Sequence, residues 1–282
     1  MTSVTLPLRT LWESRTLVRH MTVSDMKSAH SRTVLGYLWW VLDPILMTLV
    51  YTILVGYILE RGKAHPPYPL FLMCGLIAWK GFATSILQSI KLVAKNEALI
   101  TAFRFPRSTL PVSMVFANQA FFLVAMGPLL GLALLYDVGF NHPNVNLRPE
   151  AFLFLPLVFI TQVVLTLGFA VLAACIGVFF RDLGNILRHT IRVLWYASPG
   201  IYAVVDVIKD YDGLLSVDFT RIEDFFVLNP FVHIIEGYRA IFMKGQMPDL
   251  AGLGATFLFA ITVFLFSLRV FQRNEARFVK YV

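Results

Sequence analysis

Residues 38–59, LWWVLDPILMTLVYTILVGYIL, decide the class of fold. The stretch has 22 residues, of which Asp43 alone is charged. A helix of this length rises about 33 Å, at about 1.5 Å per residue, which is enough to cross the hydrocarbon core of a bilayer. Trp39 and Trp40 stand at its start, where aromatic side chains favour the membrane interface. We therefore predict a membrane-spanning helix.

The composition of the whole chain supports this interpretation. Of its 282 residues, 57% are hydrophobic and only 15% are charged, and the mean hydropathy is +0.70. Soluble domains carry about 25% charged residues, so a globule of this composition would have too little polar surface to be stable in water. The composition therefore excludes soluble, disordered and disulfide-rich proteins and indicates an integral membrane protein.

Five more apolar runs follow the first, so the sequence predicts an all-α polytopic membrane protein with six transmembrane helices. The runs cover or lie within residues 70–90, 109–136, 151–180, 193–207 and 250–268. The fifth run is short, and Pro199 and Gly200 interrupt it. Short, interrupted helices at membrane depth normally line a cavity or pack against protein.

Two segments outside these runs have the pattern of amphipathic helices. Residues 1–36 are basic with an incomplete apolar face, which favours an amphipathic helix on the membrane surface; a solvated tail is the alternative. In residues 230–243, apolar side chains recur at i, i+3, i+4 and i+7, and His233, Glu236 and Arg239 lie between them.

The distribution of charge predicts the orientation of the chain, whose net charge is +7. The N-terminal segment, residues 91–108 and 181–192 and the C-terminal residues from 269 hold 16 Lys and Arg against 5 acidic residues. The loops on the opposite side hold 7 against 11. Because basic residues concentrate in cytoplasmic loops, we expect the first set, including both termini, in the cytoplasm. The positive charge then needs no nucleic-acid partner.

The sequence lacks the signatures of common enzyme sites. A phosphate-binding loop requires a Gly-Lys pair followed by Ser or Thr, but the pair Gly62-Lys63 precedes Ala64. No Cys and His residues have the spacing of a metal site, and Cys74 and Cys175 lie in apolar runs, where we expect them to be packing residues. We therefore expect no catalysis and no metal site in this chain.

Two kinds of residue could line a transport path. Lys80 and Asp43 are ionisable residues within predicted spans; they could face an aqueous path or be structural, and a direct pair requires Lys80 to lean toward the cytoplasm. Tyr and Trp offer a flat apolar face with a hydrogen-bond donor, which suits sugars. The aromatic residues considered for such a path, with lipid contact and packing as the alternative, are Tyr37, Trp39, Trp40, Tyr51, Trp79, Trp195, Tyr196 and Tyr202.

A short helical stretch is predicted on the cytoplasmic side at residues 95–101. Phe103 and Phe105 follow it, between charged residues. Exposed aromatic side chains in such a setting can anchor a protein partner. A connecting loop that lies on lipid headgroups is the alternative.

Six motifs, in this order, resemble ABC-2 type permeases, and most closely their branch of polysaccharide, O-antigen and wall teichoic acid exporters. The motifs are RTVLGYLWW with DP (32–44), PLFL with GLI and W (69–79), FRFPR with LP (103–111), FRDL (180–183), SPGIY (198–202) and LNPF with EGYR (228–239). No single motif is decisive, but six in the right order over residues 30–245 are specific. The sequence departs from the family at Asp43, where members often carry Asn or Glu, and at Lys80, where a neutral residue is expected.

The resemblance implies an architecture and roles for individual residues. It implies a homodimer served by two copies of a separate nucleotide-binding subunit, which binds ATP and Mg, so that this chain holds no cofactor. It also implies one ABC-2 type transmembrane domain over residues 1–282, with an N-terminal interface helix (1–36), a six-span bundle (37–270) and a cytoplasmic tail (271–282). Two short re-entrant helices would lie between spans five and six on the outer side.

Three groups of residues take roles from this resemblance. A helix coupled to the ATPase would comprise Asn96, Glu97, Ala98, Leu99, Ile100 and Thr101. The interface helix and the cytoplasmic gate region would include Arg32, Leu35, Gly36, Arg181 and Asp182. An outer re-entrant helix would carry His233, Glu236 and Arg239.

The expected function is export of a lipid-linked cell-envelope polymer, such as wall teichoic acid, O-antigen or a related polysaccharide, across the bacterial cell membrane. An ion-coupled secondary transporter that uses Lys80 and Asp43 is the first alternative. A membrane-embedded transferase is the second, and its candidate site is the acidic set Asp206, Asp210, Asp212, Asp218, Glu223 and Asp224.

Overall fold

The computed structural model describes residues 5–29, 34–58, 67–180, 182–202 and 228–278, and within these ranges every regular element is helical. Five of the helical segments are long and apolar enough to cross a membrane. They are Gly36–Ile58, Tyr68–Ser89, Thr109–Gly139, Pro149–Phe179 and Leu250–Phe278. The five uninterrupted spans predicted from the sequence are therefore confirmed, and the chain is a multi-pass membrane protein.

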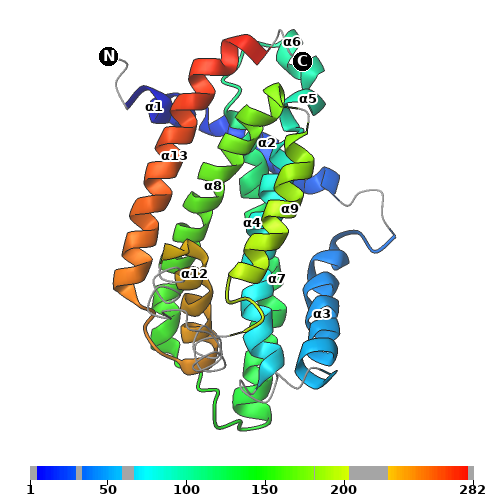
Figure 1. The fold of residues 1–282 in the computed structure, drawn as a ribbon, viewed down its shortest axis with the longest axis vertical. Helices are drawn as coiled ribbons and strands as arrows, with labels where there is room; N and C mark the ends of the chain where they lie inside the picture. The colour runs from blue at the N-terminus through cyan, green and yellow to red at the C-terminus, as the bar shows by residue number, and fades with distance from the viewer. Residues whose placement is uncertain (1–4, 30–33, 59–66, 181, 203–227, 279–282) are drawn as a thin grey trace, which may run out of the picture.

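Helix α4 (Tyr68–Ser89) is the central helix of the bundle. It packs against α7 (Thr109–Leu134) and α8 (Leu155–Phe179), and α13 (Leu250–Phe278) packs along α8 (Figure 1). Within the most apolar stretch of α4, 67% of the residues are buried, against 17% for the segment that contains α3. The interior of the protein is thus built around α4.

Helix α3 (Trp39–Tyr51) stands at the side of the bundle, as Figure 1 shows, and it contacts mainly α4 and α7. Gly36 begins the segment with a φ of +49°, a left-handed conformation that glycine adopts without strain. Leu35 and Gly36 thus form a turn that leads into α3. A π-helical turn, Thr52–Ile58, extends α3.

The structure corrects the boundary of the fifth apolar run. Residues 181–192 were predicted as a charged loop, but α9 begins at Leu183 and ends at Ala197 (Leu183–Ala197). The loop prediction was wrong because Arg188 and Arg192 lie on the exposed side of an amphipathic helix that buries Ile191 and Trp195. Residues 203–227 lie outside the described residues, so a sixth span and two re-entrant helices stay predictions.

The helix predicted at residues 230–243 is confirmed as α12 (Pro230–Arg239) with a π-helical turn, Ala240–Lys244. The side chain of Asn229 accepts a hydrogen bond from the backbone N–H of Phe231 at 3.0 Å and so caps the helix. Most of the apolar side chains of α12 are buried against α4, α8 and α13.

One end of the molecule, drawn at the top of Figure 1 and called the upper end below, gathers the short helices. They are α1 (Thr5–Glu13), α2 (Arg15–Ala29), α5 (Leu92–Lys95) and α6 (Glu97–Ala102). Val18 of α2, Val93 of α5 and Ile100 of α6 share a buried cluster with Phe278 of α13. The predicted N-terminal helix is thus present, as two helices.

The structure also corrects the end of the last span. The sequence placed it at residue 268 and a tail at 271–282, but α13 continues to Phe278. Phe271 and Phe278 are fully buried, and Arg107 at the start of α7 donates a hydrogen bond to the carbonyl oxygen of Glu275. Packing at the upper end therefore extends the helix beyond its apolar run.

Gly177 of α8 tests the close contact between α8 and the end of α4. A methyl group at Gly177 would come far inside contact distance of the carbonyl oxygen of Ile90, and overpacking of this kind costs about 1–3 kcal/mol. We expect Gly177→Ala to lower the unfolding temperature of the detergent-purified protein. Gly127→Ala in α7 is the matched control, because nothing lies within 4 Å of its added methyl group. Equal unfolding temperatures for the two variants would contradict the packing.

Candidate functional site

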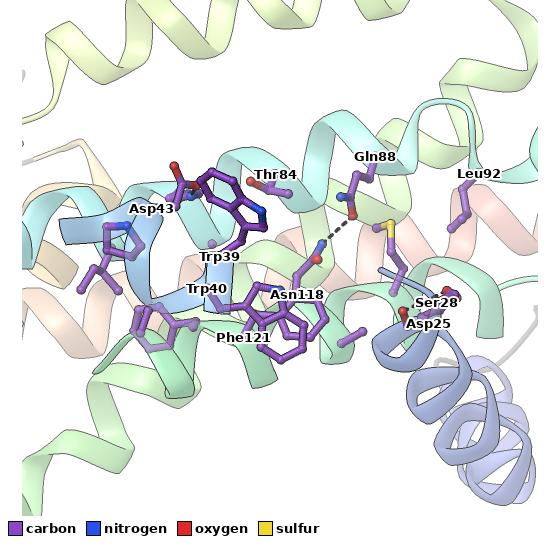
Figure 2. A pocket seen from close by; sticks show the side chains of 18 of the residues that line it. Asp25, Ser28, Trp39, Trp40, Asp43, Thr84, Gln88, Leu92, Asn118 and Phe121 are labelled. Carbon is purple, nitrogen blue, oxygen red and sulfur yellow. Dashed lines mark hydrogen bonds and ion pairs between the residues drawn. The ribbon is translucent and has the colours of Figure 1, made fainter. Parts of the chain in front are cut away.

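A cavity of about 1000 Å³ lies between α3, α4 and α7. Residues of α2 and α5 line it at the upper end, and Figure 2 shows it from close by. Its lining mixes aromatic rings, amides, hydroxyls and charged groups. A cavity with an apolar wall and a few convergent polar groups is the usual form of a ligand-binding site.

Aromatic rings from α3 and α7 form one part of the wall. Trp40 packs against Phe121 with ring centroids 3.6 Å apart, and Tyr37 packs edge-on against Trp40 at 4.8 Å. Trp39, from the same turn of α3, also lines the cavity and is 38% exposed. These rings offer a flat apolar surface on which the C–H face of a sugar could stack.

Amide and hydroxyl groups from α4 and α7 form another part of the wall (Figure 2). The side chain of Asn118 donates hydrogen bonds to the amide oxygen of Gln88 at 2.9 Å and to Oγ of Ser85 at 3.2 Å. Thr84 lies one turn before Gln88 on α4. Within the described residues, nothing bonds to the NH2 group of Gln88 or to the amide oxygen of Asn118. These two groups can therefore bind a ligand.

Lys80 of α4 and Asp43 of α3 form an ion pair across the cavity wall. Their side chains are 47% and 39% exposed, and both line the cavity. Of the alternatives that the sequence left open, the structure contains the direct pair. The pair joins the loosely packed α3 to the central helix α4.

A second pair of opposite charges lines the upper end of the cavity. Asp25 of α2 accepts a hydrogen bond from Ser113 at 3.5 Å, and Lys95 of α5 lies nearby. Burial raises the pKa of the Asp25 carboxyl above its ordinary value, while the charge of Lys95 and the hydrogen bond from Ser113 oppose that rise. Asp25 and Lys95 thus place opposite charges at this end of the cavity.

The aromatic residues predicted for a transport path lie in different places. Trp39 and Trp40 line the cavity together with Lys80. Trp79 is 7% exposed and packs on Trp195, with ring centroids 5.5 Å apart, in the core of the bundle. Its side chain is therefore not part of the cavity lining.

The remaining tyrosines lie in three different places. Tyr37 packs on Trp40 beside the cavity, and Tyr51 packs against the main core. Tyr196 is 54% exposed on α9, and the hydroxyl of Tyr202 donates a hydrogen bond to its carbonyl oxygen at 2.8 Å. A path role for these side chains stays a prediction.

The residues predicted for the gate region are only partly described. Arg32 and Arg181 lie outside the described residues. Leu35 and Gly36 form the turn before α3, and Asp182 stands directly before α9. No hydrogen bond or ion pair joins Leu35 or Gly36 to Asp182 within the part of the chain that the structure describes.

The predicted coupling residues form a short surface helix at the upper end. Asn96 precedes α6 and donates a hydrogen bond from its amide to the carbonyl oxygen of Leu92 at 2.8 Å. Ile100 is 3% exposed and anchors the helix, and Leu99 is half-buried. The side chains of Glu97, Ala98 and Thr101 are exposed. The arrangement leaves one face of α6 open to a partner.

Arg239, predicted for an outer re-entrant helix, is buried in the core with 1% exposure. Its guanidinium donates hydrogen bonds to Glu236 at 2.7 Å, to the carbonyl oxygen of Gly200 at 3.1 Å and to that of Phe71 at 3.4 Å. It also lies 3.4 Å from the centroid of the Phe71 ring. One side chain therefore joins α12, α4 and the turn after α9.

The two other residues of this predicted set lie nearer the surface. Glu236 pairs with Arg239 and lies 3.9 Å from Lys244. Nδ1 of His233 lies 3.8 Å from Asp249, whose carboxylate accepts hydrogen bonds from the first turn of α13. These contacts are structural, and the three residues do not converge on a common cavity.

Sequence reasoning missed Asp25, Gln88 and Asn118 as lining residues of the cavity. A signal for Asn118 was present, because the lining positions of α7 recur at the i, i+3, i+4 and i+7 spacing of one helix face. They are Met114, Ala117, Asn118, Phe121, Phe122 and Ala125. A polar side chain such as Asn118 in an otherwise apolar helix indicates the face of α7 that packs against protein and not against lipid.

No group of three His, Cys, Asp or Glu residues that could hold a metal ion occurs among the described residues. The acidic set proposed for a transferase site, from Asp206 to Asp224, lies within 203–227 and so outside them. The transferase site therefore stays a prediction.

A double-mutant cycle tests the ion pair of Lys80 and Asp43. We expect Asp43→Asn and Lys80→Gln each to lower the free energy of unfolding, and the double variant to lose less than the sum. Because both groups are partly exposed, the coupling should be about 0.5–1 kcal/mol. Denaturant unfolding of the four proteins in detergent measures it. Strictly additive losses would show that the two charges do not interact.

A second variant tests the role of Arg239. Arg239→Ala removes a buried cation and leaves the carbonyl oxygens of Gly200 and Phe71 without their donor. Leaving a buried acceptor without its donor costs about 1–3 kcal/mol, and the packing of the buried side chain is lost as well, so we expect a large drop in unfolding temperature. Lys244→Ala serves as the control, since its pair with Glu236 is exposed and 3.9 Å long and should contribute less than about 1 kcal/mol. Similar effects of the two changes would contradict this assignment.

Comparison with known proteins finds relatives among O-antigen and polysaccharide export proteins. No protein-family model matches the chain. It is 26% identical over 273 residues to an O-antigen export system permease protein RfbA of Myxococcus xanthus, with 97% of this chain and 98% of the relative covered. An RfbA permease of Klebsiella pneumoniae is 25% identical, with 92% of each covered.

A polysialic acid transport protein KpsM of Escherichia coli is 23% identical, with 92% of this chain and 93% of that protein covered. The relatives therefore match almost the entire chain. This confirms the resemblance stated from the sequence: the chain is a relative of the ABC-2 type permeases of O-antigen and polysaccharide export.

Proposed function

We propose that this chain is the permease subunit of an ABC exporter that moves a lipid-linked cell-envelope polysaccharide from the cytoplasm to the outer face of the bacterial cell membrane. The similarity to O-antigen export permeases over 97% of the chain carries the proposal. The cavity between α3, α4 and α7 supports it, because its wall combines stacking rings with amide groups. O-antigen or a related polysaccharide is the proposed cargo; wall teichoic acid stays an alternative of the same class.

The upper end is the proposed cytoplasmic side. It carries α1, α2, α6 and the basic end of α13, and basic segments remain in the cytoplasm. The exposed face of α6, with Glu97, Ala98 and Thr101, is the proposed contact with a nucleotide-binding subunit. That subunit would bind ATP and Mg and hydrolyse ATP.

Two copies of this chain and two nucleotide-binding subunits form the proposed complex. ATP binding would bring the ATPase pair together and displace the two α6 helices. Ile100 packs in the same buried cluster as Val18 of α2 and Phe271 of α13. A displacement of α6 would thus be transmitted to the bundle through packed side chains.

The ion-coupled alternative gains no support from the cavity. Lys80 and Asp43, its coupling residues, neutralise each other. To bind and release an ion, the pair would have to separate in every cycle, at the cost of two unpaired charges next to apolar helices. A nucleotide-driven mechanism has no such requirement.

Deletion of the gene in the source bacterium tests the proposed function. We expect surface polysaccharide to be lost and lipid-linked polymer to accumulate on the cytoplasmic face, and we expect an affinity-tagged copy of the chain to co-purify with a nucleotide-binding subunit. Normal surface polymer, together with a chain that purifies without any ATPase, would overturn the proposal.

The charge of α6 offers a sharper test of the coupling face. Glu97→Lys reverses an exposed charge without touching the buried anchor Ile100, so we expect weaker association with the ATPase and less surface polymer. Glu150→Lys makes the same change at the opposite end of the molecule and should leave both unchanged. If Glu97→Lys behaves like this control in pull-down and export assays, α6 is not the contact.

A further inference from the structure

The charged groups that line the cavity cancel one another. Among the described residues, the lining holds two carboxylates, Asp25 and Asp43, and two amines, Lys80 and Lys95. No Arg, Glu or His of the described ranges lines it. The formal charge of the lining is therefore zero, although the chain as a whole carries +7.

One lysine of the cavity is already paired, because Lys80 forms an ion pair with Asp43. The other, Lys95, shares its end of the cavity with the carboxylate of Asp25, which also accepts a hydrogen bond from Ser113. An anionic ligand would therefore compete with Asp43 for Lys80, and it would meet the negative charge of Asp25 near Lys95.

The surroundings make that competition costly for an anion. The cavity is bounded by three apolar helices, and an anion that gives up hydration there without gaining a cationic partner is disfavoured. A polymer with a charge on every unit would meet this cost repeatedly. An uncharged sugar meets no such cost, provided that its hydroxyl groups find hydrogen-bond partners.

The cavity offers partners for an uncharged sugar. The NH2 group of Gln88 can donate to a sugar hydroxyl, and the amide oxygen of Asn118 can accept from one. Trp39 and Trp40 supply flat faces for the C–H side of a sugar ring. Aromatic faces and amides lie in one cavity, as Figure 2 shows for Trp39, Trp40, Gln88 and Asn118.

We propose that the cavity between α3, α4 and α7 receives uncharged, hydroxyl-rich sugar units and discriminates against polyanionic polymers. This inference rests on the proposed export function and narrows its cargo. Trp39 and Trp40 stack on the sugar, Gln88 and Asn118 bind its hydroxyl groups, and Asp43 sets the selectivity by neutralising Lys80. The discrimination would separate this chain from a relative that transports polysialic acid.

Binding of two defined oligosaccharides to the full chain in lipid nanodiscs tests the proposal. The probes are maltoheptaose, which is uncharged, and a sialic acid oligomer of similar length, which carries one negative charge per unit. Quenching of tryptophan fluorescence reports binding, and a Trp39→Phe/Trp40→Phe variant identifies the signal of the cavity. We expect maltoheptaose to bind at least about tenfold more tightly than the sialic acid oligomer.

Charge variants make the test specific for the cavity. Asp43→Asn leaves Lys80 unpaired and should strengthen binding of the sialic acid oligomer several-fold, with little effect on maltoheptaose. The double variant Asp43→Asn/Lys80→Gln restores neutrality and should restore discrimination. Glu150→Gln changes the net charge of the chain equally, at an exposed position outside the cavity, and should change neither affinity.

Three outcomes would overturn the inference. They are equal or tighter binding of the anionic oligomer to the unmodified chain, no effect of Asp43→Asn on the ratio of affinities, and no binding of maltoheptaose. None of them touches the proposed export function, which fails instead if gene deletion leaves surface polysaccharide unchanged. The two failures are therefore distinguishable.

Discussion

In a chain this apolar, a polar group inside the helix bundle must find its partner within the protein, because hydrocarbon offers none. Arg239 meets this requirement with Glu236 and with carbonyl oxygens from two other segments. Tyr238 does so by donating a hydrogen bond to Gln162 of α8 at 2.8 Å. Since α12 presents both of these groups, they fix its position against α4 and α8 together with its buried apolar side chains.

The same requirement explains why one side of the bundle remains open. Helix α3 buries little of its surface, and the ion pair of Asp43 with Lys80 joins it to α4. The space between them is lined by amides and paired charges, so it is a polar cavity between apolar helices. A firmly packed part around α4, α8 and α12 thus supports a loosely packed part in which a ligand fits.

The sequence predicted those parts of the fold that depend on local pattern, and it missed those that depend on packing. Long apolar runs predicted the spans, and the i, i+3, i+4 spacing predicted α12. Each pattern depends only on which residues along a single helix are apolar. The start of α9 and the end of α13 were not predicted, because tertiary contacts of Ile191 and Phe278 hold charged segments in helical form.

The candidate site was less predictable than the fold. The pairing of Asp43 with Lys80 depends on how α3 and α4 lean toward each other, which the periodicity of the sequence does not show. Trp79 and Trp40 have similar settings in the sequence, yet one lies in the core and the other in the cavity wall.

Transport by the purified complex tests the central claim most directly. The chain is reconstituted in liposomes with its nucleotide-binding subunit and a lipid-linked oligosaccharide of uncharged sugars, and movement of the sugar across the bilayer is measured. The account predicts movement that requires both proteins and ATP hydrolysis and that stops when the ATPase is catalytically inactive. Movement driven by an ion gradient through this chain alone, without ATP, would contradict it.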